Sequence, residues 1–349
     1  MRKKLKLVKN IICSNFRYRL PQPYKLTFIV TYKCNLKCAI CNVWKNPSVS
    51  AEMGPDAIGK TFRSINNLGW LDLSGGEITL KEGILEIIRT ITINSRKLCV
   101  LHFATNGQLP QEAVLIAQEI GRRRVVPVVN VSIDGPQGLH DELRGVNGAY
   151  KMAVETFTAL KKLRKGHCYI SCTLSRYNIG RIDEFLSGLK RDIPGFNIRD
   201  LHFNIFHNSR VYYHNQGIDG LAGVGVESLM RYLRLAKSGG LIKSFLEDKY
   251  IKWLPHYLRG NKVPMRCQAM RSGCFINPEG RVYPCSIYDA PAGDLKDYDY
   301  DLNALWKSRQ SLEVCGRIEE GRCPGCWSPC EAYPAILGNI LGRIKKTEG

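Results

Sequence analysis

The chain has 349 residues, 44% of them hydrophobic, and a formal net charge of +20. That apolar content excludes a disordered chain, and no apolar run approaches the roughly 18 residues that a membrane span needs. The length predicts more than one ordinary domain. The apolar pair at residues 11–12 is too short for a secretion signal, so we expect a cytoplasmic protein. Fourteen cysteines in a reducing compartment indicate metal or redox chemistry more than disulfides.

The positive charge is concentrated in a basic N-terminal extension, residues 1–25. The first fifty residues contain eleven Lys and Arg, and no Asp or Glu precedes Glu52. Solvated surface explains this positive charge as well as binding to an anionic partner does. Such a partner would be a phosphate-bearing substrate, an acidic peptide, a membrane surface or, least expected, nucleic acid. Residues 2–19 fit either an interfacial amphipathic helix, which would make the protein peripheral at the membrane, or a frayed basic tail.

Strand-like apolar segments alternate with amphipathic helical stretches through the first two-thirds of the chain. Repeated βαβ units predict a parallel sheet with right-handed crossovers, and six units make a partial (β/α)6 barrel of the α/β class over residues 26–225. We expect its strands at residues 26–32, 69–75, 100–106, 125–134, 168–175 and 201–207.

Polar and glycine residues follow these strands, where a βα barrel places its chemistry. Their sequences are C-x3-C-x2-C after the first strand, SGGE after the second, TNG after the third, SIDGP after the fourth and HN after the sixth. One or two such motifs at strand ends are expected by chance, but five are hardly explained that way. We therefore expect the functional site at this end of the barrel.

A different region begins after the sixth strand. Residues 226–264 read as a helical linker with few site-like residues. Seven cysteines then fall between Cys267 and Cys330, with many glycines and prolines. That composition is typical of a small α+β module held by metal, which we place at residues 265–335. A basic tail at residues 336–349 completes the predicted organisation.

The loop after the first strand offers three thiols, Cys34, Cys38 and Cys41. A structural zinc site needs a fourth ligand, whereas three thiolates suit a [4Fe–4S] cluster with one iron left open. Buried free cysteines and a zinc knuckle are the alternatives.

At this point a resemblance enters. CNLKCAIC, followed by SGGE, TNG and SIDGPQGLHDELRG, resembles the radical S-adenosylmethionine (SAM) superfamily, and more narrowly its members with a C-terminal SPASM or twitch module. The resemblance implies that Cys34, Cys38 and Cys41 bind a [4Fe–4S] cluster whose open iron chelates SAM. It further implies reductive cleavage of SAM to a 5′-deoxyadenosyl radical that abstracts hydrogen from a substrate. A flavodoxin or ferredoxin would supply the electron.

The resemblance also implies SAM contacts but no catalytic acid or base. Glycines let a backbone approach a ligand closely, and a carboxylate accepts from an ammonium group. Purely structural roles stay open, because Glu77 also fits a helix N-terminal acid, Ser132 and Asp134 fit a turn, and Arg144 fits a surface residue. The implied contacts are Gly75, Gly76, Glu77, Asn106, Ser132, Asp134 and Arg144.

The C-terminal cysteines resemble the opening of SPASM and twitch modules, in which a hairpin presents ligands to an auxiliary cluster. The resemblance implies one complete four-ligand set of twitch type, Cys267, Cys285, Cys323 and Cys326. The longer SPASM pattern is compressed here, so a second cluster or a replaced ligand stays open for Cys274, Cys315 and Cys330. We expect at least one auxiliary [4Fe–4S] cluster, with a zinc ribbon as the alternative.

Three functions compete. The basic N-terminus favours a reaction on an anionic or lipid- or carrier-linked metabolite, and so does the lack of an obvious peptide-clasping extension before the barrel. Peptide or protein modification, common among SPASM relatives, is the alternative. A non-enzymatic Fe–S electron carrier is the third, but a carrier needs no SAM site such as the one implied at Glu77.

Overall fold

The computed structural model describes residues 2–46, 51–235 and 241–341 of the chain. Within these residues, a sheet of nine strands forms the frame of the fold. The strands lie in the order β6-β5-β4-β3-β2-β1-β7-β8-β9. Neighbours from β1 to β6 pair in parallel, which confirms the expected partial barrel. These strands are β1 (Lys25–Ile29), β2 (Trp70–Ser74), β3 (Val100–Thr105), β4 (Val126–Ser132), β5 (His167–Leu174) and β6 (Leu201–Ile205).

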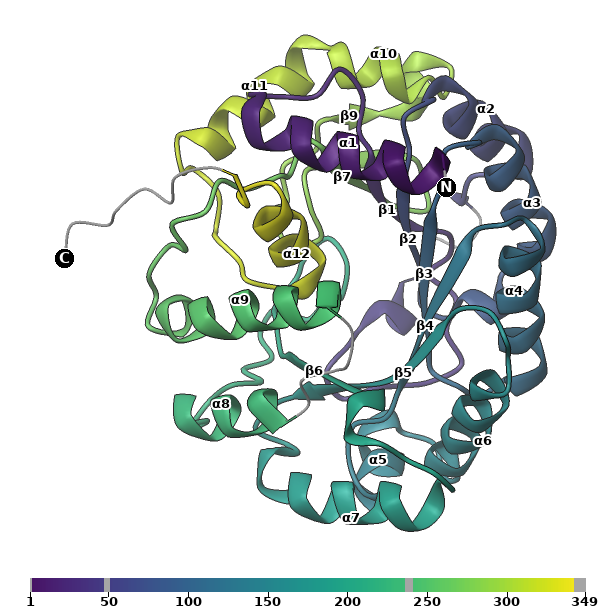
Figure 1. Ribbon diagram of the computed structural model, residues 1–349, viewed down its shortest axis with the longest axis vertical. Helices are drawn as coiled ribbons and strands as arrows, with labels where there is room; N and C mark the ends of the chain where they lie inside the picture. The colour runs from purple at the N-terminus through teal and green to yellow at the C-terminus, as the bar shows by residue number, and fades with distance from the viewer. Residues whose placement is uncertain (1, 47–50, 236–240, 342–349) are drawn as a thin grey trace.

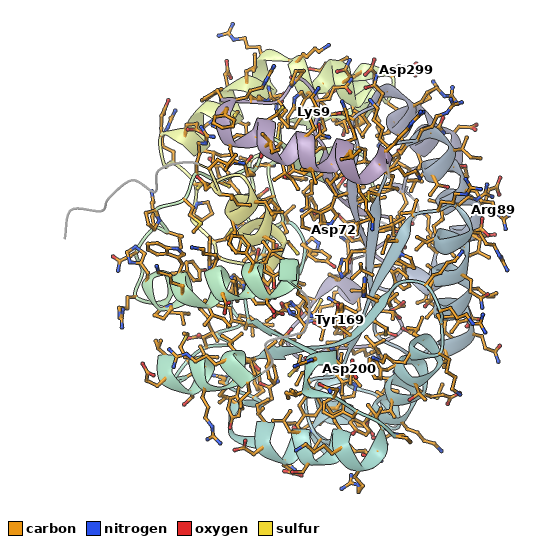
Figure 2. The ribbon with its side chains drawn as sticks, in the orientation of Figure 1. Lys9, Asp72, Arg89, Tyr169, Asp200 and Asp299 are labelled. Atoms are coloured by element: carbon orange, nitrogen blue, oxygen red, sulfur yellow. The ribbon has the colours of Figure 1, made fainter. Side chains whose placement is uncertain are left out.

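The strands curve into an arc with a convex and a concave side (Figure 1). In β3, Leu101 and Phe103 are buried in the hydrophobic core, while His102 between them is partly exposed on the other face. Residues two apart share a face of a strand, and β4 shows the same alternation of buried and partly exposed residues. Asp72 of β2 and Tyr169 of β5 lie on the concave side (Figure 2).

Helices cover the convex face (Figure 1). The isoleucines of α3 at positions 84, 87, 88 and 91 are all buried, and this spacing gives the helix one apolar stripe toward the sheet. The helices between the strands are α2 (Pro55–Ser64), α3 (Ile84–Asn94), α4 (Pro110–Arg122), α5 (Gln137–Arg144), α6 (Ala149–Lys161) and α7 (Ile182–Asp192). Short 3-10 helices are η1 (Val43–Lys45), η3 (Ile78–Leu80), η4 (Ile179–Arg181), η5 (Ile198–Asp200) and η6 (Leu295–Tyr298).

The cysteine-rich C-terminal region continues the barrel sheet. Strand β7 pairs in parallel with β1, with Gly273 opposite Lys25, and β8 and β9 follow as antiparallel strands. A Cβ at Gly273 would lie 2.8 Å from the carbonyl oxygen of Lys25, which explains the glycine at this junction. The elements are β7 (Gly273–Ile276), β8 (Arg281–Tyr283), β9 (Gly293–Asp294), α10 (Leu302–Lys307), α11 (Arg309–Glu319) and α12 (Pro329–Leu337).

Helices α8 (Val226–Leu235) and α9 (Leu241–Leu258) lie on the side of the arc that the strands leave open (Figure 1). Helix α9 packs on α12, where Tyr250 stacks on Trp327 with ring centroids 6.0 Å apart. The indole of Trp327 also donates to the carbonyl oxygen of Tyr250 at 2.8 Å. The C-terminal region is thereby joined to the helical segment as well as to the sheet.

The domain boundaries expected from the sequence stay a prediction, since one sheet runs through the barrel and the C-terminal region. Part of the expected tail, residues 342–349, lies outside the described residues. The N-terminal segment is a helix rather than a frayed tail, α1 (Arg2–Phe16). Among the described residues, no helix combines the length and the apolarity needed to cross a bilayer.

Candidate active site

The three cysteines of the first loop lie together at the carboxyl end of β1. Burial, assisted by the neighbouring Cys38, raises the pKa of the Cys34 thiol to about 11 and that of Cys41 to about 12. The backbone amides of Leu36 and Val43 donate to Cys34 and Cys41, each two residues after its cysteine. Such N–H···S contacts stabilise thiolates that bind a metal or cluster.

The end of α5 clamps this loop. The amides of Lys37 and Ala39 donate to the carbonyl oxygens of Arg144 and Leu143 at 3.2 and 2.8 Å. The guanidinium of Arg144 lies 3.7 Å from Sγ of Cys38. The last turn of α5 therefore fixes both the backbone and one thiol of the loop.

Arg144 is paired on its other side with Asp134, which follows β4. Arg144 Nη2 lies 2.5 Å from Asp134 Oδ2, and both side chains are largely buried. Asp134 Oδ1 accepts from the amide of Thr173 at 2.9 Å, and the amide of Asp134 donates to Nδ1 of His140 at 3.0 Å. Burial would lower the pKa of Arg144, but Asp134 and Cys38 together outweigh it, so the pKa of Arg144 is raised. The pair links β4, β5 and the loop of Cys34, Cys38 and Cys41.

The two glycines after β2 pack against the backbone of the first loop. The amide of Gly76 donates to the carbonyl oxygen of Thr31 at 2.8 Å. A Cβ at Gly76 would lie 2.5 Å from the carbonyl oxygens of both Tyr32 and Lys33, and one at Gly75 would lie 2.8 Å from that of Thr31. The glycines are thus required by the contact between two loops, a reason that differs from the ligand approach expected from the sequence.

Glu77 connects the ends of β2 and β3. Its Oε2 accepts from the amide of Asn106 at 2.6 Å, and its Oε1 accepts from the hydroxyls of Thr79 and Thr105, both at 2.9 Å. Burial raises the pKa of this carboxyl. Asn106 in turn donates through Nδ2 to Oδ1 of Asn35 at 2.8 Å, beside Cys34 at 4.0 Å. Glu77 thereby holds Asn106 against the loop that contains Cys34, Cys38 and Cys41.

Ser132, the last residue of β4, stands opposite Ser171 of β5. The seven expected SAM contacts therefore all lie at the carboxyl ends of β2, β3 and β4 or at the end of α5, around one loop. Their placement at this end follows from the parallel sheet, because all carboxyl ends of parallel strands share an edge.

A segment after β6 closes the outer side of the loop, and the sequence analysis assigned it no role. The amide of Asn42 donates to the carbonyl oxygen of Tyr213 at 2.9 Å, and Asn215 donates to that of Ile40 at 3.1 Å. The rings of Tyr212 and Tyr213 stack with centroids 4.4 Å apart, and the Tyr212 hydroxyl lies 2.5 Å from Oγ of Ser74. The paired tyrosines after the sixth strand were the signal available in the sequence.

Charged side chains also occupy the concave face further down the strands. Lys25 Nζ lies 3.2 Å from Asp72 Oδ2, and His102 Nδ1 lies 3.4 Å from Asp72 Oδ1. The indole of Trp70 donates to Asp72 at 2.8 Å. Burial opposes ionisation, but Lys25, His102 and the indole of Trp70 together outweigh it and lower the pKa of Asp72 to about 2. The interior of the arc therefore contains a buried ion pair below the loop.

Four C-terminal cysteines form a second group of neighbouring thiols. Burial raises the pKa of Cys267 to about 12 and those of Cys285 and Cys326 well above the ordinary value. Cys323 adds to the rise at Cys267, and Cys267 and Cys285 each add to that at Cys326. Backbone amides again donate to sulfur two or three residues on, from Ala269 to Cys267 at 3.4 Å and from Tyr288 to Cys285 at 3.3 Å. This group has the composition of the four-ligand set expected from the sequence.

The other C-terminal cysteines lie elsewhere. Cys274 is buried in β7 opposite Leu26, and Cys315 is buried in α11. Cys330 lies in the first turn of α12, where its carbonyl oxygen accepts from Lys25 at 3.2 Å. Each of the three therefore occupies a different element.

Both groups of thiols fit iron–sulfur clusters by their chemistry, since they combine several buried sulfurs with N–H donors aimed at them. Among the described residues, no three or more His, Cys, Asp or Glu side chains are arranged to hold a single metal ion. The ligands of a cubane stand further apart than those of one ion, because four irons and four sulfides separate them.

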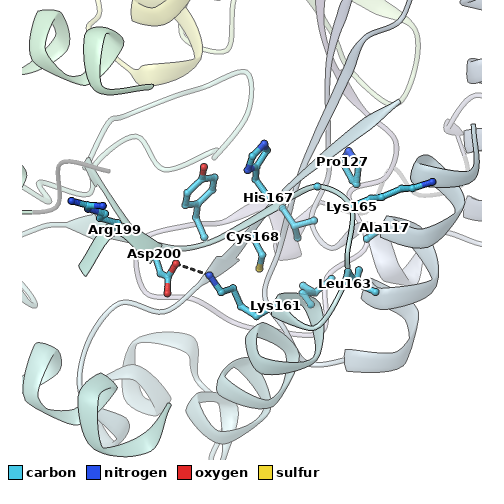
Figure 3. A pocket seen from close by; sticks show the side chains of 13 residues that line it. Ala117, Pro127, Lys161, Leu163, Lys165, His167, Cys168, Arg199 and Asp200 are labelled. Atoms are coloured by element: carbon cyan, nitrogen blue, oxygen red, sulfur yellow. Dashed lines mark hydrogen bonds and ion pairs between the residues drawn. The ribbon is translucent and has the colours of Figure 1, made fainter. Parts of the chain in front are cut away.

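A cavity of about 500 Å³ lies at the opposite end of the strands (Figure 3). It opens between the start of β5 and the end of α6, where Lys161 pairs with Asp200 at 2.7 Å. Its lining includes Pro127, Lys165 and His167. The cavity is separate from both cysteine groups.

Known families match the chain at both cysteine groups. Residues 28–187 match the radical SAM superfamily, and residues 267–330 match the SPASM iron–sulfur cluster-binding domain. The chain is thus a member of the radical SAM superfamily with a SPASM domain. It is an enzyme of the class that binds SAM at a [4Fe–4S] cluster, and its SPASM domain adds auxiliary Fe–S binding.

Curated relatives are similar over nearly the whole chain. Mycofactocin maturase MftC of Mycobacterium ulcerans is 24% identical over 95% of this chain and 86% of its own length. The antilisterial bacteriocin subtilosin biosynthesis protein AlbA of Bacillus subtilis is 22% identical over 91% and 70%. An AdoMet-dependent heme synthase of Methanosarcina barkeri is 24% identical over 87% and 88%.

Solved structures share the fold. Streptococcus suis SuiB superposes with a TM-score of 0.59 at 15% identity, covering 89% of this chain and 71% of that one. The enzyme anSMEcpe with bound AdoMet gives a TM-score of 0.53 at 18% identity, covering 84% and 82%. At these identities the likeness establishes the architecture alone.

Proposed function

We propose that the chain is a maturase-type radical SAM enzyme that modifies a peptide or protein. The observation that carries this proposal is the similarity to mycofactocin maturases, which extends over 95% of this chain. The similarity to AlbA, a bacteriocin biosynthesis protein, points the same way. These relatives favour peptide or protein modification over the metabolite reaction that the basic N-terminus led us to expect first.

In this proposal Cys34, Cys38 and Cys41 hold the SAM-binding cluster. When bound and reduced, that cluster supplies the electron that cleaves SAM to methionine and a 5′-deoxyadenosyl radical. The chain's part is to position and protect the group. The amides of Leu36 and Val43 stabilise two of the thiolates, and backbone contacts from α5 fix the loop that presents all three.

Arg144 and Asn106 have positioning roles. The guanidinium of Arg144 keeps a positive charge beside Cys38, which stabilises a thiolate and attracts the SAM carboxylate. Asp134 orients that guanidinium and keeps it ionised. Because Glu77 already accepts from Asn106 and two threonines, we assign it the task of holding Asn106 in place as well as any contact with the SAM amino group.

For the auxiliary cluster we propose Cys267, Cys285, Cys323 and Cys326 as ligands. Their mutual proximity supports this set, and so do the amide donors at Cys267 and Cys285. Of the remaining C-terminal cysteines, Cys330 stands nearest to this set in sequence, shortly after Cys326. Cys274 and Cys315 fit better as buried core residues of β7 and α11.

The experiment that tests the function compares substrate classes directly. Reconstituted enzyme is incubated anaerobically with SAM, a reductant and short peptides encoded beside its gene, and 5′-deoxyadenosine and peptide mass are followed. We expect peptide-dependent 5′-deoxyadenosine and a changed peptide mass. A tetrapyrrole forms the second arm, because the heme synthase relative favours a small-molecule reaction as the second candidate. Turnover with the tetrapyrrole and with none of the peptides would overturn the proposal.

A further inference from the structure

Helix α1 has its apolar residues on the outside. Leu5, Val8, Ile12 and Phe16 are 62%, 51%, 44% and 69% exposed. Their spacing of three and four residues places them in one row along the helix. A surface helix of a globular protein normally turns such a row toward the core. Here the row is exposed and has no partner within the described part of the chain.

Buried polar residues on the inner side of α1 hold the helix in place. Asn10 and Asn67 are joined by two hydrogen bonds of 3.2 Å, one of them to the Asn67 carbonyl oxygen. Asn15 donates to the carbonyl oxygen of Leu337 at 2.9 Å, and Arg266 donates to that of Asn15 at 2.9 Å. These contacts fix the rotation of the helix, so the outward row is a feature of the fold.

The row continues onto the end of the described chain. Asn15 Oδ1 accepts from the amide of Leu341 at 2.9 Å, which places the residues after α12 beside the end of α1. Ile340 and Leu341 are 47% and 57% exposed. Exposed apolar side chains from both ends of the chain therefore gather on one side of the molecule. We call this surface, formed by Leu5, Val8, Ile12, Phe16, Ile340 and Leu341, the terminal face.

Positive charge surrounds the terminal face. Arg2, Lys4, Lys9 and Arg17 are exposed on the same helix or directly after it, and no acidic residue occurs before Glu52. Lys3 donates to the carbonyl oxygen of Arg124 at 3.3 Å, so the charges of the adjoining loop add to those of α1. An apolar row bordered by lysine and arginine is the chemistry of a helix that lies in the surface of an anionic bilayer.

We propose that the terminal face docks the enzyme on an anionic lipid bilayer. The apolar row enters the boundary between headgroups and acyl chains, and the surrounding cations contact lipid phosphates. Nucleic acid would use the cations but leave the apolar row uncovered, and a second copy would bring two basic surfaces together. Helix α1 contacts residues before β2 and β4, at the amino ends of the strands. Docking therefore leaves the cysteine loop, at the carboxyl ends, turned away from the lipid and open to a reductant.

Vesicle flotation of the full chain tests the proposal. We expect binding to vesicles of phosphatidylcholine mixed equally with phosphatidylglycerol, weak binding to phosphatidylcholine alone, and loss of binding at high salt. Replacing Leu5, Val8, Ile12 and Phe16 together by Gln should weaken binding at least tenfold. Lys4→Gln and Lys9→Gln should each weaken it about fivefold.

Matched controls separate docking from general changes of surface. Ile93, Leu115 and Leu235 are similarly exposed on other helices, and their joint replacement by Gln should leave binding unchanged. Lys151→Gln and Lys307→Gln are the charge controls, and circular dichroism checks that every variant is folded. Failure of the wild type to bind mixed vesicles would overturn the proposal. Undiminished vesicle binding by the variant with all four Gln replacements would also overturn it. So would a wild-type dimer that these replacements abolish, if the wild type binds no vesicles.

Discussion

Arg144 at the end of α5 donates to the thiol of Cys38 at 3.7 Å across 106 residues of sequence. Its second contact, with Asp134, makes it the link between a buried carboxylate and the first cysteine loop. This link predicts how the site responds when the cation is removed.

The variant Arg144→Met leaves the Asp134 carboxylate buried without its partner. Breaking a buried ion pair from one side costs about 3–5 kcal/mol of the free energy of unfolding, which urea denaturation measures. Arg144→Met combined with Asp134→Asn should recover part of this loss. Arg181→Met, which removes an exposed ion pair with Glu184, should leave the stability close to that of the wild type. Equal stability of Arg144→Met and the wild type would refute the role of the pair.

The glycine pair after β2 gives a prediction about iron content. In Gly76→Ala the new Cβ meets two backbone oxygens at 2.5 Å, so the cysteine loop must move. We expect reconstituted Gly76→Ala to lose iron at the first cluster as well as SAM affinity. Gly121→Ala is the matched control, because a Cβ there has no neighbour within 4 Å. Full iron content with reduced SAM binding would show instead that the glycine only admits the ligand.

The barrel was predictable because its strands are apolar runs of regular spacing, and all six were found where the sequence placed them. The carboxyl-end rule then placed the site. The structure added what periodicity does not encode, such as the backbone contact at Gly76 and the full set of donors around Glu77. These contacts depend on how separate loops meet, and a single sequence records no such distances.

The C-terminal region was harder to predict for a related reason. Cysteine spacing suggested clusters, but it gave no sign that β7 would pair with β1 and join the module to the barrel sheet. The spacing placed Cys326 in the four-ligand set but left the role of Cys330 open. In the structure, amide donors at Cys267 and Cys285 mark two of the expected ligands, a feature that depends on turns rather than on residue type.

Serine replacement of single cysteines tests the auxiliary set. Each single replacement in the proposed set should lower the iron content by up to about four atoms per chain, the content of one cubane. The set is Cys267, Cys285, Cys323 and Cys326. Cys274→Ser and Cys315→Ser should retain it and serve as controls in the same region. Iron analysis and Mössbauer spectroscopy provide the readout. Zinc without iron in the variant that lacks Cys34, Cys38 and Cys41 would establish a zinc ribbon instead.

His140 predicts the dependence of stability on pH. Burial, followed by the charge of Arg144, lowers the pKa of His140 to about 4, against an ordinary value of about 6.5. The folded state holds the neutral ring, so its contribution to stability is complete above pH 6.5 and is lost as the pH falls toward 4. This group alone should make the protein about 2 kcal/mol less stable at pH 5 than at pH 7.5.

The measurement compares urea denaturation of His140→Asn and the wild type at both pH values. The variant should lose less stability between them, while His167→Asn, at an exposed position, should behave as the wild type does. Parallel behaviour of all three proteins would show that folding does not shift the pKa of His140.

The central claim is that Cys34, Cys38 and Cys41 hold the cluster that cleaves SAM. Its most direct test is the rate of 5′-deoxyadenosine formation by wild type and by the triple Cys→Ala variant, both reconstituted anaerobically and supplied with SAM and a reductant. We predict that the wild type forms 5′-deoxyadenosine, and that the variant forms none while retaining the iron of the C-terminal group. Undiminished 5′-deoxyadenosine formation by the triple variant would contradict the account.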